Sequence, residues 1–165
     1  MAEFLEVIAL VAATVTTGLF AGLFYAFAIA VMPGLRRCDD RTFVQAMHHM
    51  NTAILNGWFV LIFVGAAAWT ILAAVLSLGG EDRSTLMWIL AALALHGATL
   101  AITFAVNVPL NDSLNAAGTA DHDSELALVR ERFEARWVRW NVARALASTA
   151  ATGCLAWALV LHGRT

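Results

Sequence analysis

The charged residues of this chain leave four long stretches without any Asp, Glu, Lys or Arg. These stretches are residues 7–35, 42–80, 84–111 and 145–163, and they contain 29, 39, 28 and 19 residues. A helix needs about 20 mainly apolar residues to cross a hydrocarbon core about 30 Å thick. Each stretch is long enough for one crossing, so the sequence predicts four transmembrane helices.

The composition agrees with a membrane-embedded chain. Hydrophobic residues make up 61% of the sequence and charged residues 13%, and the mean hydropathy is +0.74. Soluble domains carry about 25% charged residues. The net charge of −2 leaves no basic excess for a nucleic-acid partner. The apolar runs are continuous, whereas strands of a membrane barrel alternate over about 10 residues. We therefore expect an all-α polytopic membrane four-helix bundle whose main partner is the lipid bilayer.

The spans are placed at about residues 7–32, 52–78, 86–110 and 142–162 of a single transmembrane domain, residues 1–165. Segment 42–51 carries His48, His49 and Asn51, and polar residues of this kind are typical of an interfacial lead-in. Before the last span, apolar residues recur at steps of three and four, at Leu126, Val129, Phe133, Trp137 and Trp140. This stripe predicts that the fourth helix extends into the cytoplasm, with both tryptophans at headgroup depth.

All ten basic residues are arginines, and they are distributed unevenly along the chain. Eight of them follow the first span or cluster around the start of the fourth. Because loops rich in Arg and Lys stay in the cytoplasm, we expect both long connections inside and both termini outside the cell membrane. Cys38 then lies in a reducing compartment and Cys154 in the last span, so no disulfide between them is expected.

The first and third spans share a pattern around a proline. The sequence reads Val31-Met32-Pro33-Gly34 in one and Asn107-Val108-Pro109-Leu110 in the other. A charged stretch and then an Asn at the threshold of the next span follow each of them. The distance from Pro to Asn is 18 residues in the first half and 32 in the second. Two parallel two-helix repeats and two generic hairpins are both compatible with this pattern.

Ionisable and amide side chains are costly inside a bilayer, so each one predicted there needs a partner or a function. In the third span, His96, Thr103, Asn107 and Asn111 fall on one helical stripe. No predicted span contains a carboxylate that could pair with Arg144. Amide oxygens and water, lipid headgroups reached by snorkelling, or a bound anion would each satisfy its guanidinium.

Depth along the helices indicates which polar side chains meet. If the third span enters near Leu86 from outside, His96 lies about 15 Å down, near the midplane. The polar residues near the cytoplasmic face would then surround a cavity: His48, His49, Asn51, Asn107, Asn111, Trp140, Asn141 and Arg144. Simpler roles compete with this interpretation, because interfacial His49 and Trp137 are typical membrane anchors, and Asn51 and Asn107 can bond a neighbouring helix.

Three segments stand out together: Asn107-Val108-Pro109-Leu110-Asn111, the stretch from Phe133 to Arg144, and Met50-Asn51 with Ile54 and Asn56. Through them, nearly the whole chain resembles the anthrone oxygenase-like family of small integral membrane proteins. Members with a role in polyketide pathways oxidise an anthrone to an anthraquinone, and most bacterial members have no known substrate. The resemblance implies an oxygenase-like oxidoreductase that acts on a flat hydrophobic aromatic molecule arriving through the bilayer.

The chemistry implied by the resemblance needs a base and an oxyanion site, and no cofactor. The ketone of an anthrone acidifies its CH₂ group, so a weak base can leave an enolate that reacts with oxygen. His48 or His49 would be the base, and Arg144 with Asn107 or Asn141 would hold the developing phenolate. The substrate-binding residues expected on this hypothesis are Asn51, Asn56, His96, Asn107, Asn111, Trp140 and Asn141.

Two other classes of function fit the same residues. Histidines in a membrane four-helix bundle can ligate haem or copper, which would make the chain a membrane redox protein. His96 is about two to three turns from the depth of His48, too far for both to hold one metal in a monomer. A redox protein of this kind would therefore hold haem between one His and another axial ligand, or share its site between the two chains of a homodimer. The third class is a non-catalytic membrane subunit or a binder of a hydrophobic small molecule.

Overall fold

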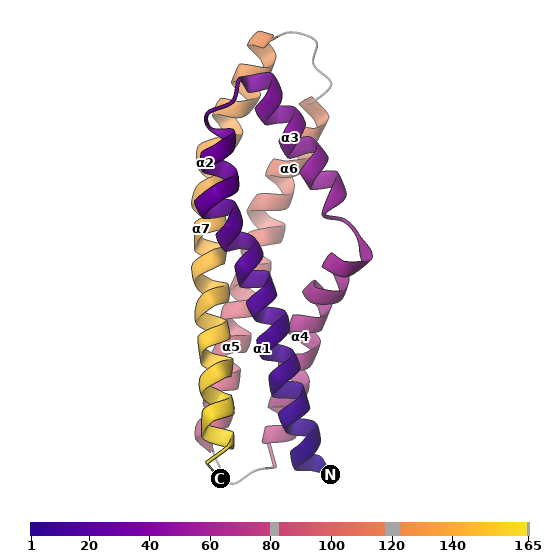
Figure 1. Cartoon of the computed structure of the whole chain (residues 1–165), viewed down its shortest axis with the longest axis vertical. Coiled ribbons are helices and arrows are strands. Elements are labelled where there is room, and N and C mark those ends of the chain that lie inside the picture. Colours follow the sequence, from indigo (N-terminus) through magenta and orange to yellow (C-terminus); the bar gives the residue numbers. More distant parts are fainter. Residues whose placement is uncertain (80–82, 118–122, 165) are drawn as a thin grey trace.

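The chain folds into a long bundle of helices (Figure 1). This computed structural model describes residues 1–79, 83–117 and 123–164. In chain order the elements are α1 (Ala2–Ala26), η1 (Phe27–Val31), α2 (Met32–Leu35), α3 (Asp40–Ala53), α4 (Gly57–Ser77), α5 (Arg83–Ile102), η2 (Thr103–Asn107), α6 (Val108–Ala117) and α7 (Asp123–His162). Every element in these three ranges is helical, which confirms the predicted all-α class.

Four helices in the described part of the chain are long and apolar enough to cross a membrane. They cover Glu3–Leu35, Gly57–Ser77, Arg83–Ala116 and Ser124–His162. The predicted four-helix membrane bundle is therefore confirmed, and the chain is a multi-pass membrane protein. Met1 and the end of α7 lie at one end of the bundle, the terminal end, while α2 and α3 meet at the opposite, connection end (Figure 1).

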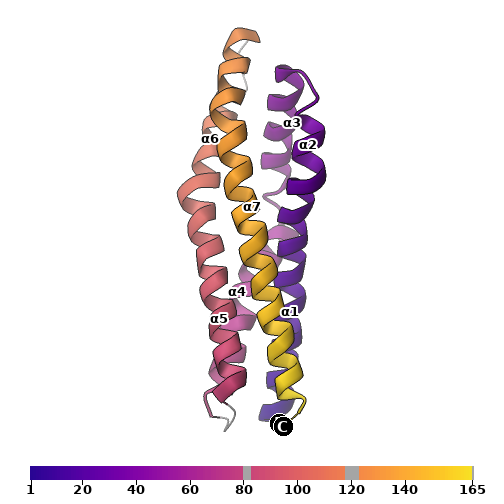
Figure 2. The same cartoon turned by 90° about the vertical axis from the view of Figure 1, so that its left-hand side faces the viewer.

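The longest element, α7, runs through the whole bundle. It has 40 residues and is about 60 Å long, roughly twice the thickness of a hydrocarbon core. It packs along both α1 and α5, whereas α4 packs mainly on α1 (Figure 2). Leu126, Phe133 and Trp137 are buried on one side of α7, so the predicted extension of the fourth helix along an apolar stripe is confirmed.

A wide π-helical turn precedes each of the two prolines. η1 ends two residues before Pro33, and η2 ends two residues before Pro109. In an α-helix, a proline removes one backbone hydrogen bond and clashes with the carbonyl four residues earlier. A π turn moves that carbonyl aside, so the helices continue past both prolines, to Leu35 and Ala117. The same turn at the same offset in both halves supports the repeat interpretation.

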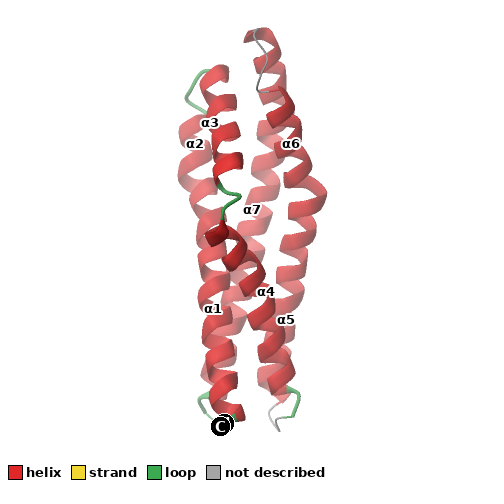
Figure 3. Cartoon of the chain, turned by 90° about the vertical axis from the view of Figure 1, so that its right-hand side faces the viewer, coloured by secondary structure: helices red, strands yellow, loops and turns green. Residues whose placement is uncertain are grey.

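The two halves differ beyond their prolines. In the second half α7 is one continuous helix, whereas a break at residues 54–56 divides the first half into α3 and α4 (Figure 3). Asn56 stabilises the break from both sides. Its Oδ1 accepts from the N–H of Phe59 at 3.1 Å, and its Nδ2 donates to the carbonyl of Ala53 at 2.8 Å. The chain turns outward from the bundle at this point (Figure 1).

Three clusters of buried side chains fill the bundle along its length. Small residues such as Ala13 and Ala73 dominate the cluster nearest the terminal end and let the helices approach closely. An aromatic cluster around Phe20 follows. Larger side chains, among them Met47 and Phe133, fill the connection end. Small residues thus bring the helices together at one end, and large residues separate them at the other.

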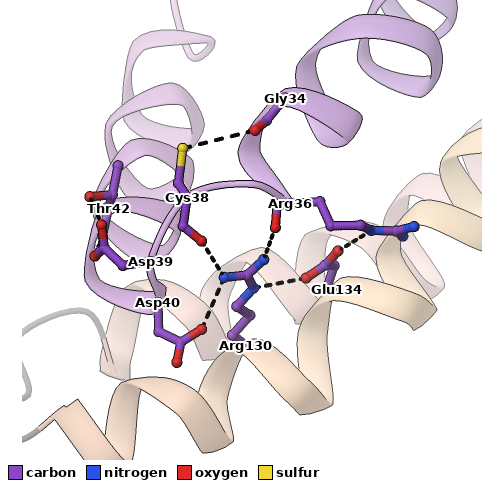
Figure 4. A network of polar contacts seen from close by, with 8 residues as sticks. All are labelled: Gly34, Arg36, Cys38, Asp39, Asp40, Thr42, Arg130 and Glu134. Carbon is purple, nitrogen blue, oxygen red and sulfur yellow. Dashed lines mark hydrogen bonds and ion pairs between the residues drawn. The ribbon is translucent and has the colours of Figure 1, made fainter.

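Arg130 of α7 ties the connection end together (Figure 4). Its guanidinium donates to the backbone carbonyls of Arg36 and Cys38, which follow α2, at 2.9 and 2.8 Å. It also forms ion pairs with Asp40 at 3.0 Å and Glu134 at 2.8 Å, and Glu134 accepts a second bond from Arg36 at 2.8 Å. Because one side chain bonds α7, the end of α2 and the start of α3, it fixes the α2–α3 turn to the long helix.

Candidate functional site

A cavity of about 340 Å³ lies between the aromatic cluster and the connection end. Its size is within the range of small-molecule sites, about 300–1,000 Å³. Residues of α1, η1, α3, α4, η2, α6 and α7 line it, together with the break between α3 and α4. The walls are mostly apolar, and the polar lining residues are Asn51, Thr103, Asn107, Asn111, Asp112, Asn115, Asn141 and Arg144.

Arg144 is buried beside this cavity, and no carboxylate in the described residues pairs with it. Its guanidinium lies over the rings of Phe24 and Trp137, 4.3 and 5.5 Å from their centroids. Nη2 donates to Asn141 Oδ1 at 3.0 Å, and Nη1 donates to Thr103 Oγ1 at 3.4 Å. Nε has no partner in the described part of the chain. A buried cation held by neutral groups alone is suited to an anionic or strongly polarised oxygen.

Asn141 holds Arg144 in place. Its Oδ1 accepts from the guanidinium, and its Nδ2 donates to the backbone carbonyl of Phe24 at 2.9 Å. Both ends of the amide therefore have partners within the protein, and only 1% of the residue is exposed. These two bonds link α7 to α1 and set the direction in which Arg144 extends.

Trp137 is buried between helices, so it is not the lipid-facing membrane anchor that its interfacial position in the sequence also suggested. Only 4% of it is exposed, and its indole Nε1 donates to Asn111 Oδ1 at 2.8 Å. Its ring packs against Phe27 and Phe133. The cause is the central position of α7, which packs on α1 and α5, so that the apolar stripe faces protein and not lipid.

His48 and His49 lie on different sides of α3, because adjacent residues of a helix are about 100° apart. His48 is half-buried, and its Nδ1 lies 3.2 Å from Oδ1 of Asn115, a residue of the cavity wall. Asn51 also lines the cavity, and its Nδ2 donates to the same oxygen at 3.4 Å. His49 is exposed and does not line the cavity. His48 itself does not line the cavity, and its ring lies against Asn115, which does.

Three other residues expected at the site lie away from the cavity. Asn56 is exposed and caps α4 at the break. His96 is buried below the aromatic cluster, with its ring 6.2 Å from that of Phe20, and neither ring nitrogen has a partner in the described ranges. Trp140 is half-buried on α7 beside Arg139. The expected residues that the cavity brings together are Asn51, Asn107, Asn111, Asn141 and Arg144.

The cavity also contains residues that the sequence did not single out. Asn115 lies four residues beyond Asn111 and so on the same ridge of the helix, a signal that extends the polar stripe of the third span. Asp112 lines the cavity next to Asn111. The aromatic wall residues Phe24 and Phe59 carry no sequence signal that separates them from other apolar residues of the spans.

The model of the family described as anthrone oxygenase matches residues 58–154 of the chain. The match covers more than half of the sequence, including α5, η2, α6 and most of α4 and α7. The chain belongs to the anthrone oxygenase family. The anthrone oxygenase segment includes the cavity residues from Thr103 to Arg144, while His48 and Asn51 precede it. Searches of the curated proteins and of the solved structures found no match.

Proposed function

We propose that the chain is an integral membrane oxidoreductase that oxidises a flat, hydrophobic aromatic ketone of the anthrone type with molecular oxygen. The observation that carries this proposal is Arg144, a buried cation without a carboxylate partner in the described residues, beside an apolar cavity. Membership of the anthrone oxygenase family supports the reaction class.

The reaction converts one CH₂ group and one O₂ into a ketone and one water. A base removes a proton from the CH₂ group, and the electrons left behind give an enolate with a phenolate-like oxygen. Oxygen accepts two electrons from the enolate carbon and forms a C–O bond, which gives a hydroperoxide after protonation. Loss of water then forms the second C=O bond. The substrate supplies all the electrons, so no further reductant is consumed.

In this proposal Arg144 binds the ketone oxygen and stabilises the charge that develops on it. Asn141 and the two aromatic faces set the direction of the guanidinium before the substrate arrives. A preorganised donor aimed at a developing oxyanion contributes about 10²–10³-fold in rate. The apolar walls strengthen this interaction because they exclude water from the site.

We assign the base to His48. The oxygen of Asn115 only accepts hydrogen bonds, so Nδ1 of His48 carries a hydrogen, and in this proposal Nε2 is the nitrogen that takes the proton. His48→Ala is expected to lower the turnover rate by about 10²–10⁴-fold without loss of expression. Asp112, the carboxylate in the cavity lining, provides the comparison. If Asp112→Asn loses activity and His48→Ala does not, the base is Asp112.

A lipid-soluble substrate can reach this cavity from the bilayer. Leu55, Val60 and Phe104 line the cavity, and each is more than half exposed on the outside of the bundle. Exposed apolar side chains of a membrane span contact acyl chains. We therefore place the access route on the side where α4 faces η2.

We further propose that the connection end faces the cytoplasm and that both termini lie outside. Eight of the ten arginines lie near the two long connections. The positive-inside rule places such segments in the cytoplasm.

The test is oxygen consumption by the detergent-purified protein supplied with anthrone. The proposal predicts one O₂ consumed per anthrone, anthraquinone as the product, and a loss of about 100-fold or more in Arg144→Ala. Arg139→Ala, which changes an exposed arginine of the same helix, is the matched control and keeps the rate. Oxygen consumption at a rate no higher than that of the uncatalysed oxidation of anthrone would refute the proposal. A Soret band in the optical spectrum of the same sample would indicate haem and favour the redox alternative.

A further inference from the structure

Asn107 borders the cavity with an amide whose two ends differ in what they can bind. The residue is 1% exposed, and its Nδ2 lies 3.5 Å from the backbone carbonyl of Trp137. Its Oδ1 has no partner in the described residues. Buried acceptors are nearly always satisfied, because leaving one unpaired destabilises the protein. The described part of the chain thus supplies no hydrogen-bond donor to the amide oxygen of Asn107.

The chemistry of the neighbouring carbonyl fixes the orientation of this amide. A carbonyl oxygen only accepts hydrogen bonds, so the end of Asn107 next to Trp137 is the NH₂ group. The other end is an oxygen that also only accepts. It repels a phenolate and binds an O–H group. This role differs from that of a phenolate holder beside Arg144, which the sequence suggested for Asn107.

We propose that Asn107 selects ligands that carry a hydroxyl group next to the ketone bound by Arg144. The inference rests on the proposed function for the kind of ligand. Thr103 accepts a hydrogen bond from Arg144 and lies four residues before Asn107 on η2. The guanidinium of Arg144 and the amide oxygen of Asn107 therefore border the same wall of the cavity. An aromatic ketone with a neighbouring hydroxyl has both groups on one edge. In the proposed complex the C=O group accepts from Arg144, and the O–H group turns away from its internal bond to the C=O group and donates to Asn107.

A ligand without the hydroxyl displaces water from the cavity and leaves the oxygen of Asn107 unpaired. A site built around a buried hydrogen-bonding group discriminates strongly against ligands that lack the matching group. The expected difference in Kd is about 10- to 100-fold. Replacement of Asn107 by an apolar residue removes the acceptor and, with it, the reason for the difference.

The test compares the binding of three ligands to the purified protein without oxygen. Anthrone lacks ring hydroxyls, anthralin carries one on each side of the same ketone, and the dimethyl ether of anthralin keeps these oxygens without their O–H groups. Quenching of tryptophan fluorescence reports Kd, because Trp137 lines the cavity. We expect the wild type to bind anthralin about tenfold or more tighter than the other two. Asn107→Leu reduces this ratio to about one, and Gln45→Leu, which removes an exposed amide of α3 outside the cavity lining, keeps it.

Equal affinity of the wild type for anthralin and anthrone overturns the inference, as does a preference that persists in Asn107→Leu. Absence of binding of all three ligands overturns it as well. If Asn107→Leu does not fold, the comparison of anthralin with its dimethyl ether in the wild type decides. The proposed function is tested separately. If the ligands bind but no oxygen is consumed in air, the proposed oxidation is refuted, whereas the inference about Asn107 is not.

Discussion

Among the described residues, Arg144 is held by neutral groups alone and lies over the rings of Phe24 and Trp137, an arrangement that is unfavourable for stability. Burial removes the guanidinium from water, and the described residues return only two hydrogen bonds to its five N–H groups. Polar groups placed at such a cost inside a membrane protein are typical of functional sites. An apolar substitution of Arg144 should therefore maintain or raise the stability of the protein and lower its activity.

Arg144→Met tests this opposition. Methionine fills much of the same volume without a charge, so we expect a melting temperature equal to or above that of the wild type. The oxygen uptake with anthrone should fall by about 100-fold or more, since the oxyanion donor is gone. A melting temperature lowered by several degrees together with retained activity would show that Arg144 is structural.

The sequence singled out residues that line the cavity, but it did not predict their hydrogen-bond partners. Arg144, Asn107 and Asn141 stand out because polar residues are rare in apolar spans. The sequence does not show that both ends of the Asn141 amide have hydrogen-bond partners within the protein, or that Trp137 donates a hydrogen bond to Asn111. These outcomes depend on contacts between helices far apart in the chain.

The two π turns contribute unequally to the cavity. η2 provides three lining residues, Thr103, Phe104 and Asn107, whereas η1 provides Phe27. A π turn changes the direction in which the side chains of the following helix extend. The geometry of η2 should therefore matter more for function than that of η1.

Pro109→Ala removes the reason for the π turn in η2 and lets the helix adopt regular α geometry. We expect a folded protein whose rate with anthrone is lower by about tenfold or more, because Thr103 and Asn107 are displaced. Pro33→Ala makes the same change in η1 and should lower the rate by less than about twofold. Equal effects of the two substitutions on the rate would contradict this account.

Arg130→Met tests the network that joins α2, α3 and α7. The substitution removes two ion pairs and leaves the carbonyls of Arg36 and Cys38 without their donor. We expect a loss of about 2–4 kcal/mol in the free energy of unfolding, measured in detergent. Arg132→Met changes an exposed arginine two residues away and should cost less than about 0.5 kcal/mol. Equal stability of the two variants would show that the network contributes little.

The sequence predicted the long helices and missed their irregularities. Gaps between charged residues decide where a chain can cross a bilayer, and this constraint does not depend on packing. The break at residues 54–56 has no proline, and only the structure shows that Asn56 bonds the helix ends on both sides of it. The π turns are also invisible in the hydrophobic pattern, although Pro33 and Pro109 mark where each is needed.

Over the whole molecule, the packing changes from one end to the other. Alanine-rich contacts close the terminal end of the bundle. The cavity lies beside the break between α3 and α4, where the chain turns outward, and next to the large side chains of the connection end. The cavity and most of the arginines therefore lie at different levels of one bundle. This arrangement makes the direction of insertion a testable property.

The native cysteines allow the direction of insertion to be measured. In a Cys154→Ser background, Cys38 near the connection end should react with a membrane-impermeant maleimide only after the cells are permeabilised. A cysteine introduced at the exposed Arg164 of a variant lacking both native cysteines should react in intact cells. The reverse labelling pattern would place the connection end outside.

A structure of the protein with bound anthraquinone would show whether Arg144 binds the ligand oxygen. The quantity to measure is the distance between the guanidinium of Arg144 and the nearest ligand oxygen. We expect a ligand inside the cavity with a hydrogen bond of about 2.7–3.2 Å to Arg144. A ligand bound elsewhere, or an Arg144 turned toward a lipid phosphate with acyl chains in the cavity, would contradict it.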